Sequence, residues 1–311
     1  MPATLRWLGR RLILAAFVVF GAATAAFAAM NLMPGDPVLT ILGSTNPTPA
    51  LIAQVRSDLG YDEPFAVRYA EFLGRLVHGD LGQSYQLREP VTEVITGQLL
   101  PTAELALTAF VLALAVAAVL AVTTAGRRPA VRRVVSALEL LTTSSPGFWI
   151  GILLLTFLSF RIHLFPAAGG DGVNGLVLPA ITLALGMTGV FSQVLRAGLE
   201  RALEEPYALT ARARGTGETA VRTRHALRHA LIPVLTLSGW ALGTLLSGAV
   251  VVETVFGRRG IGRVMATAVI GRDVPTVTGV VIVSAVFFTL INILVDGLYR
   301  VIDPRLRQEK A

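Results

Sequence analysis

Six long stretches without a charged side chain constrain this sequence more than any other feature. Each contains 20 to 22 residues, and they cover 12–33, 105–125, 140–160, 176–195, 231–252 and 274–295. About 20 apolar residues in a helix cross the hydrocarbon core of a bilayer, so each stretch predicts a transmembrane helix. A soluble helix normally keeps a polar face. Six such stretches in 311 residues therefore favour an all-α, polytopic membrane protein with six transmembrane helices over a large soluble core.

Composition agrees with this fold class and excludes several kinds of chemistry. Only 15% of residues are charged, whereas soluble domains average about 25%. The chain has no cysteine, which excludes disulfides, thiol catalysis and cysteine-ligated metals. Its single lysine is Lys310, so no phosphate-binding loop of the P-loop type can be present. Any drive from ATP would have to come from another polypeptide.

The first stretch has two possible interpretations. Arg6, Arg10 and Arg11 precede it, and Ala26-Phe27-Ala28 resembles a signal-peptidase site. However, 22 apolar residues exceed the roughly 7–15 of a signal-peptide core. We therefore expect a retained transmembrane helix, with a cleaved signal peptide as the alternative.

Charge asymmetry between the connecting segments predicts the orientation. Segments 1–11, 126–139, 196–230 and 296–311 carry 18 basic and 8 acidic residues. The alternate segments 34–104, 161–175 and 253–273 carry 9 basic and 12 acidic residues. Because cytoplasmic loops are enriched in Lys and Arg, the first set is expected to be cytoplasmic, together with both termini. The net charge of +7 then reflects topology. The sequence has no basic stripe interleaved with aromatic residues, so nucleic-acid binding is not expected.

The predicted domain organisation has three parts. Residues 1–33 form the N-terminal segment and first helix, 34–104 an extracytoplasmic cap, and 105–311 a five-helix core. Two short amphipathic helices are expected in the cap, at Pro49–Leu59 and Pro64–His78. Structureless loops of this length are uncommon, which favours a folded cap over a long solvated loop.

The cytoplasmic segment 196–230 is the most informative connection. Pro206 follows two glutamates, which is typical of a helix start, and Gly215 is a natural helix end. A second, basic helix is expected from Glu218 to Ala230. A short helix between two spans could transmit motion from a cytoplasmic partner, although an ordinary positive loop explains the arginines equally well.

Other chemistries find little support in the sequence. His225 and His229 have the spacing of paired helical metal ligands, but flanking arginines and the lack of a third ligand favour plain surface histidines. Gly215-Thr216-Gly217 opens a G-x-G-x-x-A pattern without the strand that dinucleotide binding needs. No histidine lies in a span to support intramembrane proteolysis. No span contains an ionisable residue, which disfavours a proton-coupled secondary transporter.

Several motifs, in the same order along the chain, resemble one known family. They are Leu32–Pro37, Gly79–Tyr85, Ser145–Gly151, Tyr207–Gly215, His225–Pro233, Glu253–Phe256, Gly260–Arg263 and Asp303–Arg305. The chain resembles the B-type permease subunit of binding-protein-dependent ABC importers of the dipeptide, oligopeptide and nickel branch. The wider importer family has a characteristic cytoplasmic loop pattern, and in this chain only Ala211, Gly215 and Leu227 match it. The positions that do not match resemble the peptide branch of the family.

The resemblance implies a type I ABC importer (MetI-like) fold in a bacterial inner membrane. It implies that a coupling helix contacts an ATPase through Tyr207, Leu209, Thr210, Ala211, Arg212, Ala213, Arg214, Gly215, Thr216 and Gly217. The implied partners are a homologous second permease, two ATP-binding subunits or domains, an extracytoplasmic binding protein and the lipid bilayer, but no nucleic acid.

The same resemblance implies that this chain is no enzyme and holds no cofactor or metal, with ATP and Mg²⁺ on the ATPase partners. Di- or oligopeptides are the expected substrates. Nickel or another small solute is the alternative, and a secondary transporter that is not coupled to ATP is a more distant one.

Overall fold

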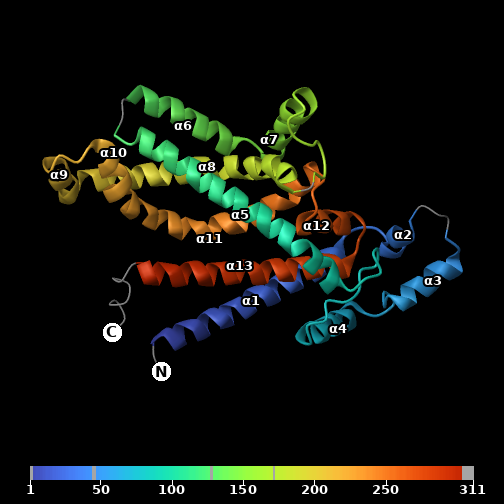
Figure 1. Ribbon diagram of the computed structural model, residues 1–311. Coiled ribbons are helices and arrows are strands. Elements are labelled where there is room, and N and C mark those ends of the chain that lie inside the picture. The colour runs from blue at the N-terminus through green and yellow to red at the C-terminus, as the bar shows by residue number, and fades with distance from the viewer. Residues whose placement is uncertain (1–2, 44–46, 127–128, 171, 303–311) are drawn as a thin grey trace. The chain divides into compact units, whose positions relative to one another are not determined.

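The computed structural model describes residues 3–43, 47–126, 129–170 and 172–302. In this part of the chain every regular element is helical, and the only β-type pairing is an isolated bridge between Gln83 and Pro90. The expected all-α class is confirmed. The helices shown in Figure 1 are α1 (Ala3–Leu32), α2 (Pro37–Leu42), α3 (Pro49–Asp58), α4 (Phe65–Val77), α5 (Val91–Thr124), α6 (Pro129–Ser144), α7 (Gly147–Leu154), α8 (Gly172–Glu204), α9 (Pro206–Ala213), α10 (Glu218–Ala220), α11 (Leu227–Val255), α12 (Ile261–Ile270) and α13 (Val274–Ile302), with π-helical segments η1 (Leu155–Arg161) and η2 (Val221–Ala226).

Among the described residues, five helices are long and apolar enough to cross a membrane. They cover Gly9–Leu32, Val91–Thr124, Gly172–Glu204, Glu218–Leu246 and Val274–Gly297. The span predicted at 140–160 is not one continuous helix, because the chain bends by 103° between Ala130–Ser144 and Gly147–Arg161. Pro146 lacks a backbone N–H and disfavours helical geometry at the residue before it. Six spans therefore result only when this bent pair is counted as one, and that span is not a straight helix.

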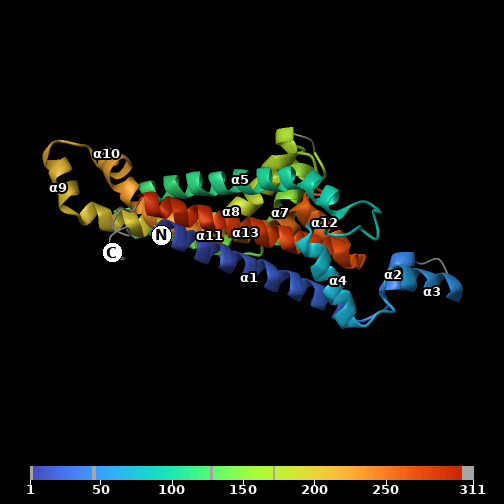
Figure 2. The ribbon, with the colours of Figure 1, turned by 90° about the horizontal axis from the view of Figure 1, so that it is seen from below.

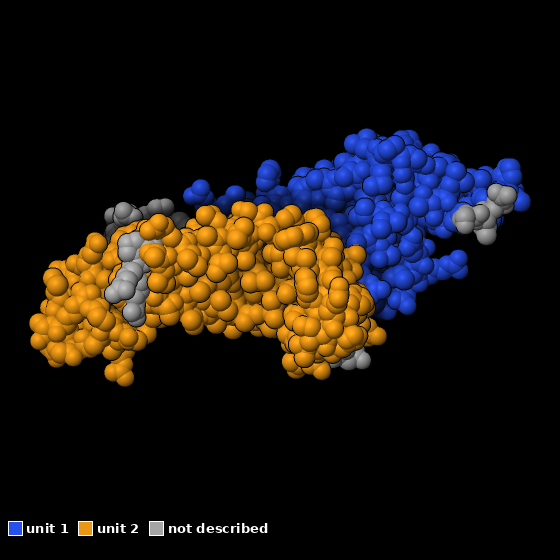
Figure 3. Space-filling model, turned by 90° about the horizontal axis from the view of Figure 1, so that it is seen from above, with its two compact units in different colours: residues 1–100, 260–289 blue, residues 101–259, 290–311 orange. Residues whose placement is uncertain are grey.

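The chain divides into two compact units, coloured separately in Figure 3. Unit 1 contains residues up to Leu100 together with Gly260–Thr289, and unit 2 contains Pro101–Arg259 and the residues from Leu290 onward. Helices α5 and α13 contribute to both units. The three predicted domains remain a prediction, but both helices expected between residues 34 and 104 are present as α3 and α4.

Unit 1 is held together by an aromatic cluster. The rings of Phe27 in α1 and Phe72 in α4 stack with centroids 4.9 Å apart. Phe65 and Tyr69 pack against Phe27 at 5.6 and 5.5 Å. Such ring pairs add to the stability gained from apolar burial. The segment after α1 is thereby a folded part of unit 1 and not a solvated loop.

A buried carboxylate organises the turns of unit 1. Asp273 precedes α13 and accepts hydrogen bonds from the hydroxyls of Ser84 and Thr276 and from the backbone N–H of Tyr85. Next to it, Arg272 donates to the carbonyl oxygen of Gly35 at 3.0 Å. Asp273 and Arg272 thus connect the turns before α2 and α5 to the start of α13.

Unit 2 is built on small residues that let helices approach closely. Fully buried alanines recur along one face of α5, at Ala109, Ala113, Ala117 and Ala121. Gly189 of α8 lies against the backbone of α6, where an added Cβ would be only 2.8 Å from the carbonyl oxygen of Glu139. Small residues at helix contacts are typical of membrane bundles, in which van der Waals packing replaces the hydrophobic effect.

Candidate coupling site

Helix α9 forms between α8 and α10 as its sequence predicts. Glu205 has extended backbone angles and Pro206 occupies the first helical position, where its missing N–H leaves no hydrogen bond unmade. The helix is closed by Gly215, whose φ of +80° few residues other than glycine adopt at low cost. The N–H groups of Gly215 and Thr216 donate to the carbonyls of Arg212 and Ala211 at 2.9 and 3.1 Å. Figure 2 shows α9 and α10 together at one end of α8 and α11, with α7 at the other end.

One face of α9 packs into unit 2. Ala208 is completely buried. The Tyr207 ring lies 5.2 Å from the ring of His229 at the start of α11, and its hydroxyl is buried without a hydrogen-bond partner among the described residues. This packing fixes the orientation of α9 against the two long helices that it connects.

The opposite face of α9 is open. Leu209 is 61% exposed, and Thr210, Ala213 and Arg214 are exposed beside it. A short, rigidly held helix therefore presents one large apolar side chain next to one cation. Such a face suits contact with a partner, because an apolar anchor with charged neighbours is a common pattern in protein interfaces.

Arg212 is used inside the chain. Its Nε donates to Glu218 Oε1 at 2.6 Å, and its Nη1 donates to the carbonyl oxygen of Leu203 at 3.2 Å. The hydrogen bond to Glu218 raises the pKa of Arg212. Arg212 therefore connects α9 to the last turn of α8 and to α10, and it is a positioning residue of the site. Sequence reasoning placed Arg212 in the site but did not identify Glu218 as its partner.

The segment that follows α9 is helical throughout 218–230, as expected, but it includes a π-helical turn that was not expected. Helix α10 continues into the π-helical turn η2 before α11 begins at Leu227. Such wide turns are rare and often occur at functional positions. No group of three potential metal ligands occurs among the described residues, and His229 instead packs on Tyr207.

A buried ion pair supports the helix that leads to α9. Arg196 of α8 donates to both carboxylate oxygens of Glu139 in α6, at 2.9 and 2.7 Å. Ser192 donates to the same carboxylate at 2.6 Å, and Ser136 accepts a bond from Arg196 at 3.3 Å. The pairing of Glu139 with Arg196 was not predicted from the sequence. The available signal was that both residues directly border an apolar stretch.

The other end of unit 2 contains a similar pairing. Thr102 donates to Glu253 at 2.6 Å, and Glu253 is completely buried. Arg258 donates to Glu104 at 2.9 Å. The buried Glu253 carboxylate thus accepts a hydrogen bond, as a buried charge requires.

Comparison with known families assigns the chain. The family model described as Binding-protein-dependent transport system inner membrane component matches residues 113–308. A second model, for the N-terminal part of such membrane components, matches residues 4–108. The chain belongs to this family of transport-system inner membrane components.

Curated members of the family align along most of the chain. A putative peptide transport system permease protein of Brucella abortus (strain 2308) is 36% identical over 292 residues, which is 91% of this chain and 93% of that protein. The glutathione transport system permease protein GsiC of Salmonella typhi is 36% identical over 288 residues, covering 92% and 93%.

Two solved structures support the fold. A chain of the MetNI methionine ABC transporter in inward-facing conformations is similar with a TM-score of 0.55. It is 20% identical and covers 68% of this chain and 96% of its own length. A second crystal form gives a TM-score of 0.53 at 22% identity. The permease fold expected from the sequence is confirmed.

Proposed function

We propose that this chain is one permease subunit of an ATP-driven importer of short peptides. It would pair with a homologous second permease, two ATP-binding subunits or domains, and an extracytoplasmic substrate-binding protein. The aligned relatives are named as peptide and glutathione permeases, and glutathione is itself a small peptide. Similarity over 91% of the chain supports the same substrate class here.

The geometry of α9 carries the proposal. A coupling element must be stiff, must be attached to the transmembrane helices, and must present a face to its partner. Helix α9 is anchored by Ala208 and Tyr207, clamped by Arg212, and exposes Leu209 and Arg214. Movement of an ATPase subunit bound to this face would be passed directly to α8 and α11.

The charge distribution supports the orientation that this proposal requires. The segment containing α9 and both termini belong to the set with 18 basic and 8 acidic residues. The positive-inside tendency places this set in the cytoplasm, where ATP is available. We further propose that ATP and Mg²⁺ bind only on the partner subunits, because this chain has no P-loop lysine.

The proposal is tested by uptake of labelled L-alanyl-L-alanine into vesicles that contain the complete importer. Uptake should require ATP, the binding protein and both permeases. Substituting Leu209→Asp should lower ATP-dependent uptake at least about tenfold, because a charge replaces the apolar anchor of the proposed contact. Leu87→Asp is the matched control, since Leu87 is 55% exposed but lies in unit 1.

Two outcomes would contradict the proposal. Equal uptake by the Leu209→Asp and Leu87→Asp variants would exclude α9 as the coupling element. Uptake by this chain alone, without an ATPase, would favour a secondary transporter.

A further inference from the structure

Unit 1 contains a small cavity that the coupling site does not involve. It has a volume of about 90 Å³ and is formed by α1, the α3–α4 connection, α4, the α4–α5 connection and the start of α13. Sites for drug-sized molecules are several times larger. A cavity of this size has room for several waters or for the end group of a small molecule.

The cavity is lined by two basic and two acidic residues that form no ion pairs with one another. Arg68 and Arg75 line it together with Glu71 and Asp80. Among the described residues, no ion pair joins any of these four side chains. Asp80 Oδ1 already accepts the backbone N–H of Gly82 at 2.8 Å. The two guanidinium groups and the Glu71 carboxylate thus remain for a ligand that carries both signs of charge.

One buried donor in this cavity also lacks a partner. Arg68 Nε is buried without a hydrogen-bond partner among the described residues, and the buried Tyr61 hydroxyl lies beside the Tyr85 phenol. The Arg68 guanidinium lies over the Tyr61 ring, 5.0 Å from its centroid, which holds the two groups together. Buried donors without a partner are uncommon in native proteins, and each is explained by a ligand, a water or a functional role.

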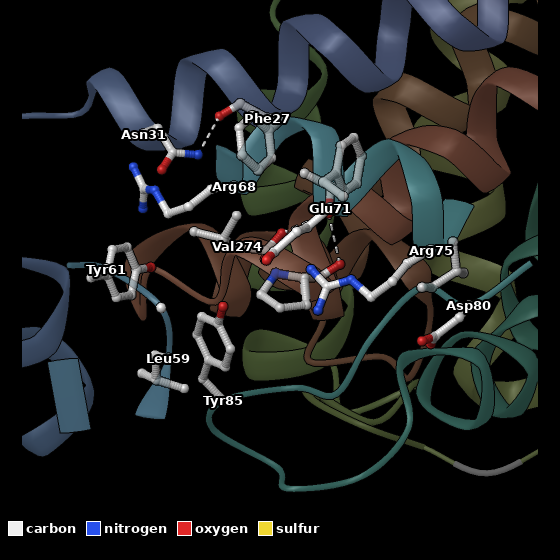
Figure 4. Close-up of a pocket in the computed structure, with 15 residues that line it drawn as sticks. Phe27, Asn31, Leu59, Tyr61, Arg68, Glu71, Arg75, Asp80, Tyr85 and Val274 are labelled. Carbon is white, nitrogen blue, oxygen red and sulfur yellow. Dashed lines mark hydrogen bonds between the residues drawn. The ribbon is translucent and has the colours of Figure 1, made fainter. Parts of the chain in front are cut away.

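The remaining polar groups complete a set suited to a carboxylate and an ammonium group. In Figure 4 the side chains of Tyr61, Glu71 and Tyr85 point into the same space. Burial raises the pKa of the Tyr61 and Tyr85 phenols, which therefore stay protonated and able to donate. Asn31 donates its Nδ2 to the carbonyl of Phe27 at 2.8 Å, which leaves its Oδ1 as an acceptor.

We infer that this cavity is a binding site for the zwitterionic end groups of a free amino acid or short peptide. Arg68 and the two phenols would bind the carboxylate, and Glu71 would bind the ammonium group. Charge balance argues against a simple anion or cation, because either would leave groups of one sign without a partner. The small volume limits recognition to the end groups. The site needs neither ATP nor the face of α9.

Equilibrium binding to the purified full-length chain in lipid nanodiscs tests this inference. The probe is radiolabelled L-alanyl-L-alanine, without ATP or binding protein. Saturable binding is expected, and Arg68→Ala should weaken it at least about tenfold, since charge-assisted hydrogen bonds are lost. Arg259→Ala is the matched control, because Arg259 is exposed and does not line the cavity.

Chemical variants of the probe identify the groups that are bound. The C-terminal amide and the N-acetyl derivative should each compete at least about tenfold less well. Glu71→Gln should lower affinity for the dipeptide but not for N-acetyl-alanyl-alanine. Glu71 is exposed, so this variant should fold even if Arg68→Ala does not. Competition by free L-alanine would identify amino acids as ligands, and its failure would restrict the site to peptides.

Three results would overturn the inference: no saturable binding, equal affinity of the Arg68→Ala, Glu71→Gln and wild-type chains, or equal competition by the neutral derivatives. Loss of ATP-dependent uptake in the transport assay would contradict the proposed function but would leave this binding result unchanged.

Discussion

Two ion pairs in unit 2 have nearly the same length but very different surroundings. Arg196 and Glu139 are 2.7 Å apart, with side chains 8% and 2% exposed. Arg212 and Glu218 are 2.6 Å apart, with side chains 32% and 55% exposed. The first joins α6 to α8 in the interior, and the second joins α9 to α10 at the surface.

The difference in burial gives the two ion pairs different roles: one stabilises the fold of unit 2, and the other orients α9. A buried ion pair is often no more stabilising than well-packed apolar residues of the same volume. Removal of one partner, however, leaves an unpaired charge in the interior, which is strongly destabilising. An exposed pair is screened by water and salt and adds little stability. We therefore expect the buried pair to govern folding of unit 2, and the exposed pair to govern only the position of α9.

The largest effect is expected for Glu139→Gln. The variant leaves the Arg196 charge without its counterion in the interior, which costs roughly 3–5 kcal/mol. Ser192 would also lose a charged acceptor 2.6 Å away. Denaturant unfolding in mixed micelles would measure the loss as a fall in the unfolding free energy.

A double variant separates the charge from the packing. Glu139→Leu combined with Arg196→Met removes both charges and keeps the volume, so stability should return close to that of the wild type. If the double variant were as unstable as Glu139→Gln, the cost would come from altered packing near Gly189 and not from an unpaired charge.

A smaller effect is expected for Gly215→Ala, with Gly217→Ala as its control. A Cβ at either position would meet no atom within 4 Å. Only Gly215 has a positive φ, +80°, whereas Gly217 has φ of −65°. Alanine at 215 should therefore cost about 1 kcal/mol of backbone strain, and alanine at 217 should not. Unfolding measurements on both variants check this, and equal stability would exclude backbone strain as the role of Gly215.

The sequence predicted the parts of the site that depend on local chemistry. Pro206 and Gly215 bound α9 as expected, because helix ends are determined by the residues that form them. It did not predict the partners of Arg196 and Arg212, because hydrophobic patterns do not specify how a helix is rotated against its neighbour. The bend at Pro146 was also missed, since a run of uncharged residues gives length but not continuity.

The cavity of unit 1 was not predicted for a related reason. Arg68 and Glu71 lie on one face of α4, but the cavity is completed by residues from distant segments of the chain, among them Asn31 and Tyr85. Only packing of these segments brings the unpaired groups together. Positions within one helix can be read from spacing, whereas a site built from five segments cannot.

The smallest effect on stability, with a clear effect on transport, is expected for Arg212→Ala. The pair with Glu218 is exposed, so the unfolding free energy should not change measurably. Without the bonds to Glu218 and to the Leu203 carbonyl, α9 would lose its fixed orientation, and less transport should result from each ATP hydrolysed.

Arg212→Lys should recover this ratio only in part, because an ammonium group cannot make both bonds in the planar arrangement of a guanidinium. High salt should lower the same ratio in the wild type, since screening weakens exposed pairs, but should leave the buried Glu139 pair and overall stability unaffected. An Arg212→Ala variant that unfolds like Glu139→Gln would show that both pairs hold the fold, and the distinction between them would then be wrong.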